Sequence, residues 1–155
     1  MNEMEDLIEW LRGVAAENNI TISTENQWSS DWVPQSQIEL RRVWYNPNWL
    51  PAYERPLTLA HEIGHILSGD AAKINCNHCS VSEKAEGDGD LIAVLLILKY
   101  CQTHDITFET RQQLIEAFKI PASMVKSVDR ATNFTLFTMR KRYHELAASS
   151  TGVFI

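Results

Sequence analysis

Apolar and polar residues alternate along the chain with two different periods, and each period predicts one kind of element. Apolar residues spaced three and four apart are typical of amphipathic helices. This spacing is found over residues 4–17, 54–67, 83–103, 107–118, 121–131 and 134–147. Alternation of single apolar and polar residues is typical of strands. It is found over residues 20–23 and 37–45, the second with one irregularity of the kind that a bulge produces.

The order of these elements predicts the fold class. One helix, then two or three strands, then further helices indicates an α+β domain. We expect a small antiparallel sheet joined to a mostly helical remainder. No low-complexity linker interrupts the sequence. The expected organisation is therefore one domain over residues 1–155, with residues 107–155 as a C-terminal helical subregion.

Turn-forming residues predict where several elements begin and end. Residues 26–37 are polar around Trp28 and Trp32, which indicates a loop. The helix over residues 54–67 can hold Pro56 in its first turn, where the missing N–H costs nothing. We expect it to end at residues 68–70, because Gly69 is suited to the left-handed conformation of a helix C-cap.

Composition narrows the class of protein. The chain has 155 residues, of which 45% are apolar, enough for a single core. Its net charge of −6 argues against direct binding of nucleic acid, which favours basic surfaces. The acidic N-terminus does not resemble a signal peptide, and no apolar run approaches the ~20 residues that cross a bilayer. Three cysteines without a secretion signal indicate a reducing compartment, so we expect a cytoplasmic protein without membrane contact.

The helix over residues 54–67 carries the strongest chemical signal. Residues 61–65 read His-Glu-Ile-Gly-His, which puts His61 and His65 one helical turn apart on the same face, where both imidazoles can bind one Zn²⁺. Glu62 then lies beside the metal, positioned as general base for a water whose pKa zinc lowers to about 7. Gly64 costs about 1 kcal/mol relative to Ala in a helix, which predicts close approach of another segment. The alternative is a pair of ordinary histidines on a helix.

A catalytic zinc site needs a third protein ligand in addition to these two histidines. No third histidine follows at the metzincin spacing, because position 71 is alanine. We therefore expect a carboxylate from the next helix, and the candidates are Glu83, Glu86, Asp88 and Asp90. Glu86 is preferred because it precedes Asp90 by one helical turn. Asp90 can then accept a hydrogen bond from the outer ring nitrogen of a zinc-bound histidine.

Residues 86–90 permit two other interpretations. The first is a calcium loop, although the segment lacks the usual order of acidic residues and the glutamate at the twelfth position. The second is a flexible acidic turn, since Gly87 and Gly89 together cost about 2 kcal/mol in a helix. In the second case Glu83 would be the next candidate for the third ligand.

The segments around this motif resemble the ImmA/IrrE family of bacterial and phage metallopeptidases between about residues 38 and 98. The likeness lies in the aromatic strand end at residues 43–46, in residues 55–65, and in the acidic segment that leads into the apolar run at 93–98. The family's acidic segment usually reads Glu-x-Glu-Ala-Asn/Asp-x-Phe-Ala. Here Glu86, Asp90 and Ala93 are kept, whereas Asp88-Gly89 replaces the Glu-Ala pair and Ile92 replaces the phenylalanine.

The resemblance implies a zincin-like fold with gluzincin-type ligation by His61, His65 and Glu86. It also implies a zinc-dependent endopeptidase that cleaves a helix-turn-helix repressor and so switches on genes of a phage, a mobile element or a stress response. Residues 114–128 look like the helical segment that follows the catalytic part in such proteins and are faintly similar to a helix-turn-helix. The alternative is that these helices cover the core.

Other residues of chemical interest leave several possibilities open. Cys76, Cys79 and His78 could bind a second zinc, with Cys101 and His104 as the nearby spare ligands, form a redox pair, or be free thiols. The candidates for stabilising the oxyanion of peptide hydrolysis are His144, His104, His78, Tyr45 and Tyr53. The strand over residues 38–45 could accept an extended substrate along a free edge, or be an ordinary covered strand.

Two functions compete with the peptidase. One is a non-catalytic zinc-containing module that acts by sequestering a transcriptional regulator. The other is a DNA-binding regulator that uses residues 110–131. The sequence leaves open the identity of the substrate and its scissile bond, the activation trigger and the oligomeric state.

Overall fold

The computed structural model describes residues 2–75 and 82–133, and for residues 70–75 and 82–86 it describes the backbone alone. The elements in chain order are α1 (Glu3–Glu17), β1 (Thr21–Thr24), β2 (Gln35–Gln37), β3 (Arg42–Tyr45), the 3₁₀ turn η1 (Ala52–Glu54), α2 (Arg55–Asn75), α3 (Ser82–Thr103), α4 (Arg111–Phe118) and the 3₁₀ turn η2 (Ala122–Met124). Residues 125–133 continue as a helix. The α+β class is confirmed. The helix predicted over residues 134–147 lies outside the described residues.

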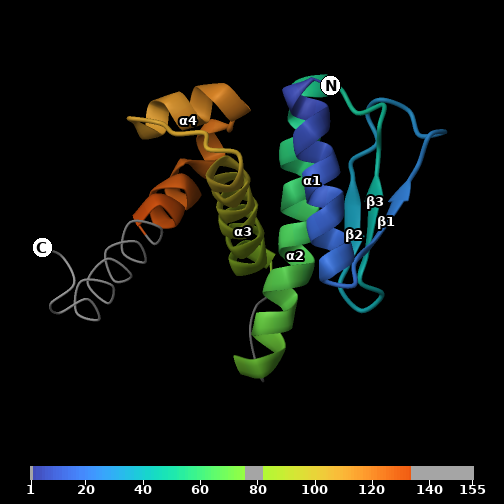
Figure 1. Ribbon diagram of the computed structural model, residues 1–155. Helices are drawn as coiled ribbons and strands as arrows, with labels where there is room; N and C mark the ends of the chain where they lie inside the picture. The colour runs from blue at the N-terminus through green and yellow to red at the C-terminus, as the bar shows by residue number, and fades with distance from the viewer. Residues whose placement is uncertain (1, 76–81, 134–155) are drawn as a thin grey trace, which may run out of the picture.

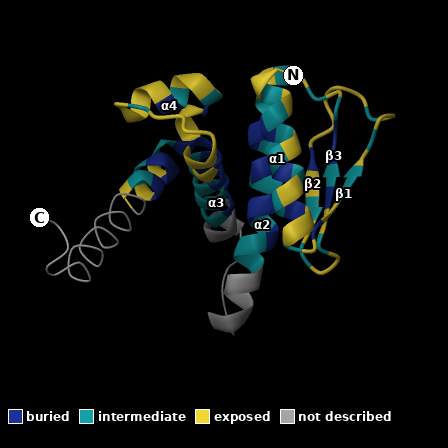
Figure 2. Ribbon diagram, viewed as in Figure 1, coloured by how far each residue is buried: buried dark blue, intermediate teal, exposed yellow. Residues whose placement is uncertain are grey.

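The elements form successive layers, with the sheet at one side of the molecule (Figure 1). Helices α1 and α2 pack on one face of the sheet, and α3 packs along α2. Leu59, Ile63 and Ile66 on α2 are completely buried, as is Ile97 on α3. Figure 2 shows buried residues, in dark blue, on α1, α2 and α3. Full burial of one such side chain contributes about 1.5–3 kcal/mol, so α2 is firmly held in the core.

The sheet is mixed, and the prediction of an antiparallel sheet was wrong. The strand order is β1-β3-β2, with β1 parallel and β2 antiparallel to β3. The β2–β3 hairpin is antiparallel because a tight turn joins the two strands. By contrast, β1 reaches β3 through the long loop before β2, which allows the parallel direction. Because β3 is paired on both sides, it cannot accept a substrate strand, and the edge strands within residues 2–75 and 82–133 are β1 and β2.

The single strand predicted over residues 37–45 is divided by a turn. Residues 38–41 leave the extended conformation, and Arg41 adopts the left-handed region with φ 47°. The Arg41 guanidinium donates to the carbonyl of Asn18 at 2.6 Å, and the Arg41 carbonyl accepts from the amide of Thr21 at 2.8 Å. Leu40 is 60% exposed, so its place in the alternating pattern did not reflect burial.

Helix α2 continues past residues 68–70, where the sequence predicted its end. Gly69 is helical and serves a packing role instead of a capping role. A Cβ atom at this position would lie 2.9 Å from Cγ2 of Ile38, so the turn between β2 and β3 rests directly on the helix. The predicted start of the next helix at residue 83 agrees with α3 to one residue.

The helices after residue 110 bury their apolar residues in the core. Thr110 caps α4 in a capping box with Gln113, and Lys119 ends the helix in the left-handed conformation. Leu114, Met124 and Val128 are buried. These contacts favour the interpretation that residues 114–128 cover the core. No helix within the described ranges 2–75 and 82–133 has the length and apolar character required to cross a membrane.

Candidate metal centre

His61 and His65 point at one another from consecutive turns of α2. Their Nε2 atoms lie 2.8 Å apart, and the two rings meet nearly at right angles with centroids separated by 4.3 Å. Glu62 belongs to the same group, because one ligand atom from each of His61, Glu62 and His65 lies within 4.8 Å of the others. The predicted convergence of the two imidazoles is therefore observed.

The separation of the imidazoles suits a shared metal ion. Two nitrogens bound to zinc at 2.0–2.1 Å in a tetrahedral arrangement lie about 3.3 Å apart. The two Nε2 atoms would need to part by only about 0.5 Å, which small rotations of the rings supply. Both histidines are half-buried and keep some access to solvent. The donor set and its geometry thus fit Zn²⁺.

Asp90 orients the first of these imidazoles. Its Oδ1 accepts a hydrogen bond of 2.8 Å from Nδ1 of His61. This contact places the proton on Nδ1 and leaves the Nε2 lone pair directed toward His65. A carboxylate in this position fixes the tautomer and raises the basicity of a histidine ligand. The predicted contact of Asp90 with the outer ring nitrogen of a histidine is therefore observed. About a fifth of the Asp90 side chain is exposed.

Two glycines bring α2 and α3 together beside the histidines. A Cβ atom on Gly64 would lie 2.6 Å from the carbonyl oxygen of Gly89, so the helices touch through their backbones. A Cβ atom on Gly89 would lie 2.9 Å from Cε1 of His65. The close approach predicted from Gly64 is confirmed. Gly89 leaves the room that the His65 ring occupies.

The acidic segment of residues 86–90 is helical. It lies within the continuous helix α3, Ser82–Thr103. A calcium loop needs a tight, non-helical backbone, so both the calcium loop and the flexible acidic turn are wrong as interpretations. Gly87 and Gly89 are tolerated inside the helix because α3 is packed along α2.

The candidates for the third ligand fall on different faces of α3. Glu83 and Glu86 belong to α3, but their side chains lie outside the described part of the molecule. Asp88 is described and is not among the described groups that could hold a metal. Successive helical residues are about 100° apart, so Asp88 is about 160° from Asp90 around the helix. Asp88 is therefore directed away from the side that meets His61.

Ser36 is a site residue that sequence reasoning missed. Its hydroxyl donates a 2.6 Å hydrogen bond to Oε2 of Glu62. Ser36 pairs with Val43 in the hairpin, and Val43 is fully buried, so both side chains face the helices. No sequence signal pointed to Ser36, because its segment had the composition of a loop. Strand pairing alone brings it to Glu62.

The proposed oxyanion donors are spread across the molecule. Tyr45 is buried below the guanidinium of Arg12, 5.3 Å from its ring, and burial raises the pKa of its hydroxyl. His104 is fourteen residues after Asp90, which corresponds to about 21 Å along a helix axis. Its Nδ1 atom forms a hydrogen bond with the carbonyl of Tyr100. Tyr53 is 53% exposed in η1. His78 and His144 lie outside the described residues.

The cysteines do not form a second site within the described residues. Cys76 and Cys79 fall outside them. Cys101 is a free, buried thiol whose pKa burial raises to about 11. A protonated thiol is a poor metal ligand, so Cys101 is unsuited to complete a zinc site.

The arrangement at residues 61–65 can bind a cation and hold a carboxylate beside it. Two imidazoles face one another, one is oriented by Asp90, and Glu62 is held by a hydroxyl from the sheet. No protein-family model, curated protein or solved structure among those compared matches this chain.

Proposed function

We propose that the protein is a zinc-dependent endopeptidase of the zincin-like type, similar to the ImmA/IrrE family. The observation that carries the proposal is the convergence of the His61 and His65 Nε2 atoms with Glu62 alongside and Asp90 on the outer nitrogen of His61. Ordinary surface histidines need neither a carboxylate behind the ring nor glycines that admit the neighbouring helix. The combination supports a catalytic zinc site with an oriented ligand.

Each residue has a distinct task in this proposal. His61 and His65 would hold Zn²⁺, and Asp90 keeps His61 in the tautomer that offers Nε2. When bound, zinc polarises the scissile carbonyl and acidifies water. Glu62 accepts the proton of the attacking water and passes it to the leaving amine. Ser36 holds the Glu62 carboxylate toward the sheet, so that its position is fixed before substrate arrives.

Glu86 is the proposed third ligand, and the geometry of α3 supports it. Gly89 meets His65 and Asp90 meets His61, so these two positions define the side of α3 that faces the histidines. With about 100° per residue, position 86 lies about 40° from Asp90 and about 60° from Gly89, between the two. Position 83 lies about 20° from Asp90 around the helix, on the side opposite to position 86, and almost one turn further from Asp90 along the helix axis. Position 86 thus lies between the two contact positions and nearer to them along α3 than position 83 does.

The proposed substrate is a protein segment in extended conformation. Within the described residues, β2 pairs only with β3, so its other edge is open. Ser36 on this strand contacts Glu62, which would bring a peptide added along β2 to the general base. By the family resemblance, we propose a helix-turn-helix repressor as that protein.

Mutation of the general base tests the proposal. Each helix-turn-helix repressor of the host cell would be mixed with zinc-loaded wild type, Glu62→Gln or Glu109→Gln, and cleavage followed by mass spectrometry. Glu109 is exposed in the segment between α3 and α4, so its variant is a control for the substitution itself. We expect wild type and Glu109→Gln to cleave one repressor. Glu62→Gln should lose about 10²–10⁴-fold in rate while keeping its zinc.

Two results would count against the peptidase. Equal cleavage by Glu62→Gln would remove Glu62 as the base. Binding of a repressor without cleavage by any variant would favour the module that acts by sequestering a regulator.

A further inference from the structure

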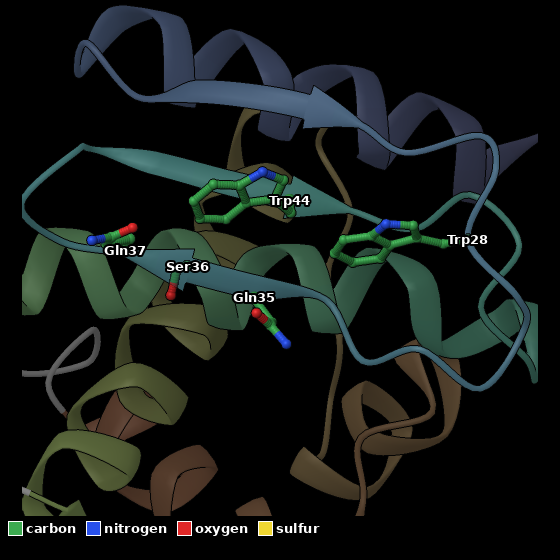
Figure 3. A pocket seen from close by; sticks show the side chains of 5 residues that line it. All are labelled: Trp28, Gln35, Ser36, Gln37 and Trp44. Atoms are coloured by element: carbon green, nitrogen blue, oxygen red, sulfur yellow. The ribbon is translucent and has the colours of Figure 1, made fainter.

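A hollow beside β2, on the outer side of the sheet, has a lining of which the proposed reaction uses only Ser36. It measures about 280 Å³ and is lined by Trp28, Gln35, Ser36, Gln37 and Trp44. Ser36 and its partner Val43 face the helices, so Gln35, Gln37 and Trp44 face the opposite way. Figure 3 shows the indoles of Trp44 and Trp28 side by side along the sheet, next to the three side chains of β2.

The lining offers flat apolar faces and unused polar groups. Both indoles are half-buried, so each ring presents part of its surface to solvent. The amides of Gln35 and Gln37 make no side-chain hydrogen bond to any residue in the described part of the chain. Among the described residues, no charged side chain lines the hollow. A ligand that covers the rings and bonds to the amides would satisfy both kinds of group.

The size and position of the hollow suit one side chain of a peptide. Sites for small molecules usually measure 300–1,000 Å³, and this hollow is smaller. It borders β2, whose outer edge is open among the described strands. A peptide added along that edge would direct alternate side chains to the two faces of the sheet. One set would face Ser36 and Glu62, and the other would lie over Trp44, Gln35 and Gln37.

The chemistry of the lining favours arginine as that side chain. A guanidinium is planar, stacks on indole and donates several N–H groups, which the oxygens of Gln35 and Gln37 can accept. The chain's net charge of −6 attracts a cation and disfavours a carboxylate. An aliphatic side chain would cover the amides without bonding to them. Arg42 lies opposite Gln37 on the same face, so a cation is better placed at the end formed by Gln35 and Trp28.

We propose that the hollow formed by Trp28, Gln35, Gln37 and Trp44 is a specificity subsite that binds an arginine side chain of a peptide lying along β2. The proposal rests on the proposed function, because it takes the substrate to be a peptide. It adds that the substrate carries arginine at a position whose side chain points to the sheet's outer face. Recognition would thus use both faces of one strand, the inner for the reaction and the outer for selection.

Binding without cleavage tests the subsite separately from the reaction. Full-length, zinc-loaded Glu62→Gln would be titrated by calorimetry with capped heptapeptides Thr-Val-Thr-Xaa-Thr-Val-Thr in which Xaa is Arg, Lys, Leu or Glu. We expect the Arg peptide to bind about 5- to 30-fold more tightly than the Leu peptide. Lys should be intermediate, because it lacks the planar stacking group. Glu should bind most weakly.

Variants assign the preference to the hollow. Trp44→Leu and Gln35→Leu should each reduce the advantage of the Arg peptide. Gln35 is exposed on an edge strand, so its variant remains informative if Trp44→Leu fails to fold. The control is Gln102→Leu on an exposed position of α3, outside the lining. This control should keep the preference.

The outcomes separate the two proposals. Equal binding of the Arg and Leu peptides, no binding of any peptide, or a preference that survives both Trp44→Leu and Gln35→Leu would overturn the subsite. Repressor cleavage by wild type together with any of these results would leave the peptidase standing. A preference for arginine without any cleavage would support the subsite and remove the peptidase.

Discussion

Replacement of Gly64 by alanine should weaken the protein through the contact between α2 and α3. The added Cβ would lie 2.6 Å from the carbonyl oxygen of Gly89, whereas real Cβ contacts essentially never fall below 3.0 Å. The helices must therefore move apart by at least about 0.4 Å, because a backbone carbonyl cannot rotate away as a side chain can. This movement would be felt next to His61 and His65.

Two opposing terms determine the size of the effect. Gly→Ala in a helix gains about 1 kcal/mol in propensity. Overpacking of a close contact costs about 1–3 kcal/mol. We expect Gly64→Ala to lose about 1 kcal/mol in the free energy of unfolding. Gly13→Ala is the matched control, because a Cβ at this position in α1 meets nothing within 4 Å. It should gain about 1 kcal/mol.

Urea denaturation of the metal-free proteins, followed by circular dichroism, measures both values. The expected difference between the two variants is about 2 kcal/mol, well above the error of a midpoint comparison. If Gly64→Ala is as stable as Gly13→Ala, the backbone contact between α2 and α3 is not as described, and the reason given for Gly64 fails.

Three further predictions concern the neighbours of the site. Asp90→Asn should lower zinc affinity about 10- to 100-fold, because it removes the charged acceptor from His61 Nδ1. Competition with a chelator measures this affinity, and an unchanged value would refute the role of Asp90. Ser36→Ala should lower kcat more than it raises KM for the cleaved repressor, because it removes the hydroxyl that donates to Glu62. Ser36→Thr should restore kcat, since the threonine hydroxyl can again donate to Glu62. A change in KM alone would contradict this role. Burial raises the pKa of the Cys101 thiol to about 11, so the folded state disfavours the thiolate. The buried thiol therefore contributes to stability below about pH 9, and this contribution is lost as the pH rises toward 11. Wild type should lose more stability than Cys101→Ala over that interval in urea denaturation, and parallel losses would refute the shift.

The convergence of His61 and His65 on one face of α2 was predictable because its signal is local. The spacing of His61 and His65 follows from helical periodicity alone, and Gly64 in mid-helix is costly enough to require a close neighbour. Asp90 could be anticipated because a histidine ligand needs a partner for its outer nitrogen. In each case the physical requirement acts within one or two turns of helix.

The features that were missed depend on contacts between distant segments. Gly69 looked like a cap, but its neighbour Ile38 lies 31 positions earlier and comes to it only when the hairpin folds onto α2. The alternation at residues 37–45 did not reveal that Arg41 turns the chain by bonding to Asn18. Ser36 became a partner of Glu62 only through its pairing with Val43. Such contacts are set by strand pairing, which the local pattern does not encode.

Zinc content is the most direct test of the central claim that His61, His65 and Glu86 form a metal centre. Elemental analysis would compare wild type with Glu86→Ala and with Asp88→Ala, a control on the same helix that is directed away from His61. We predict about one zinc per chain in wild type and in Asp88→Ala, and loss of most of that zinc in Glu86→Ala. Full zinc in Glu86→Ala would contradict its role as third ligand. No zinc in wild type, even after incubation with zinc and removal of the excess, would contradict the metal centre itself.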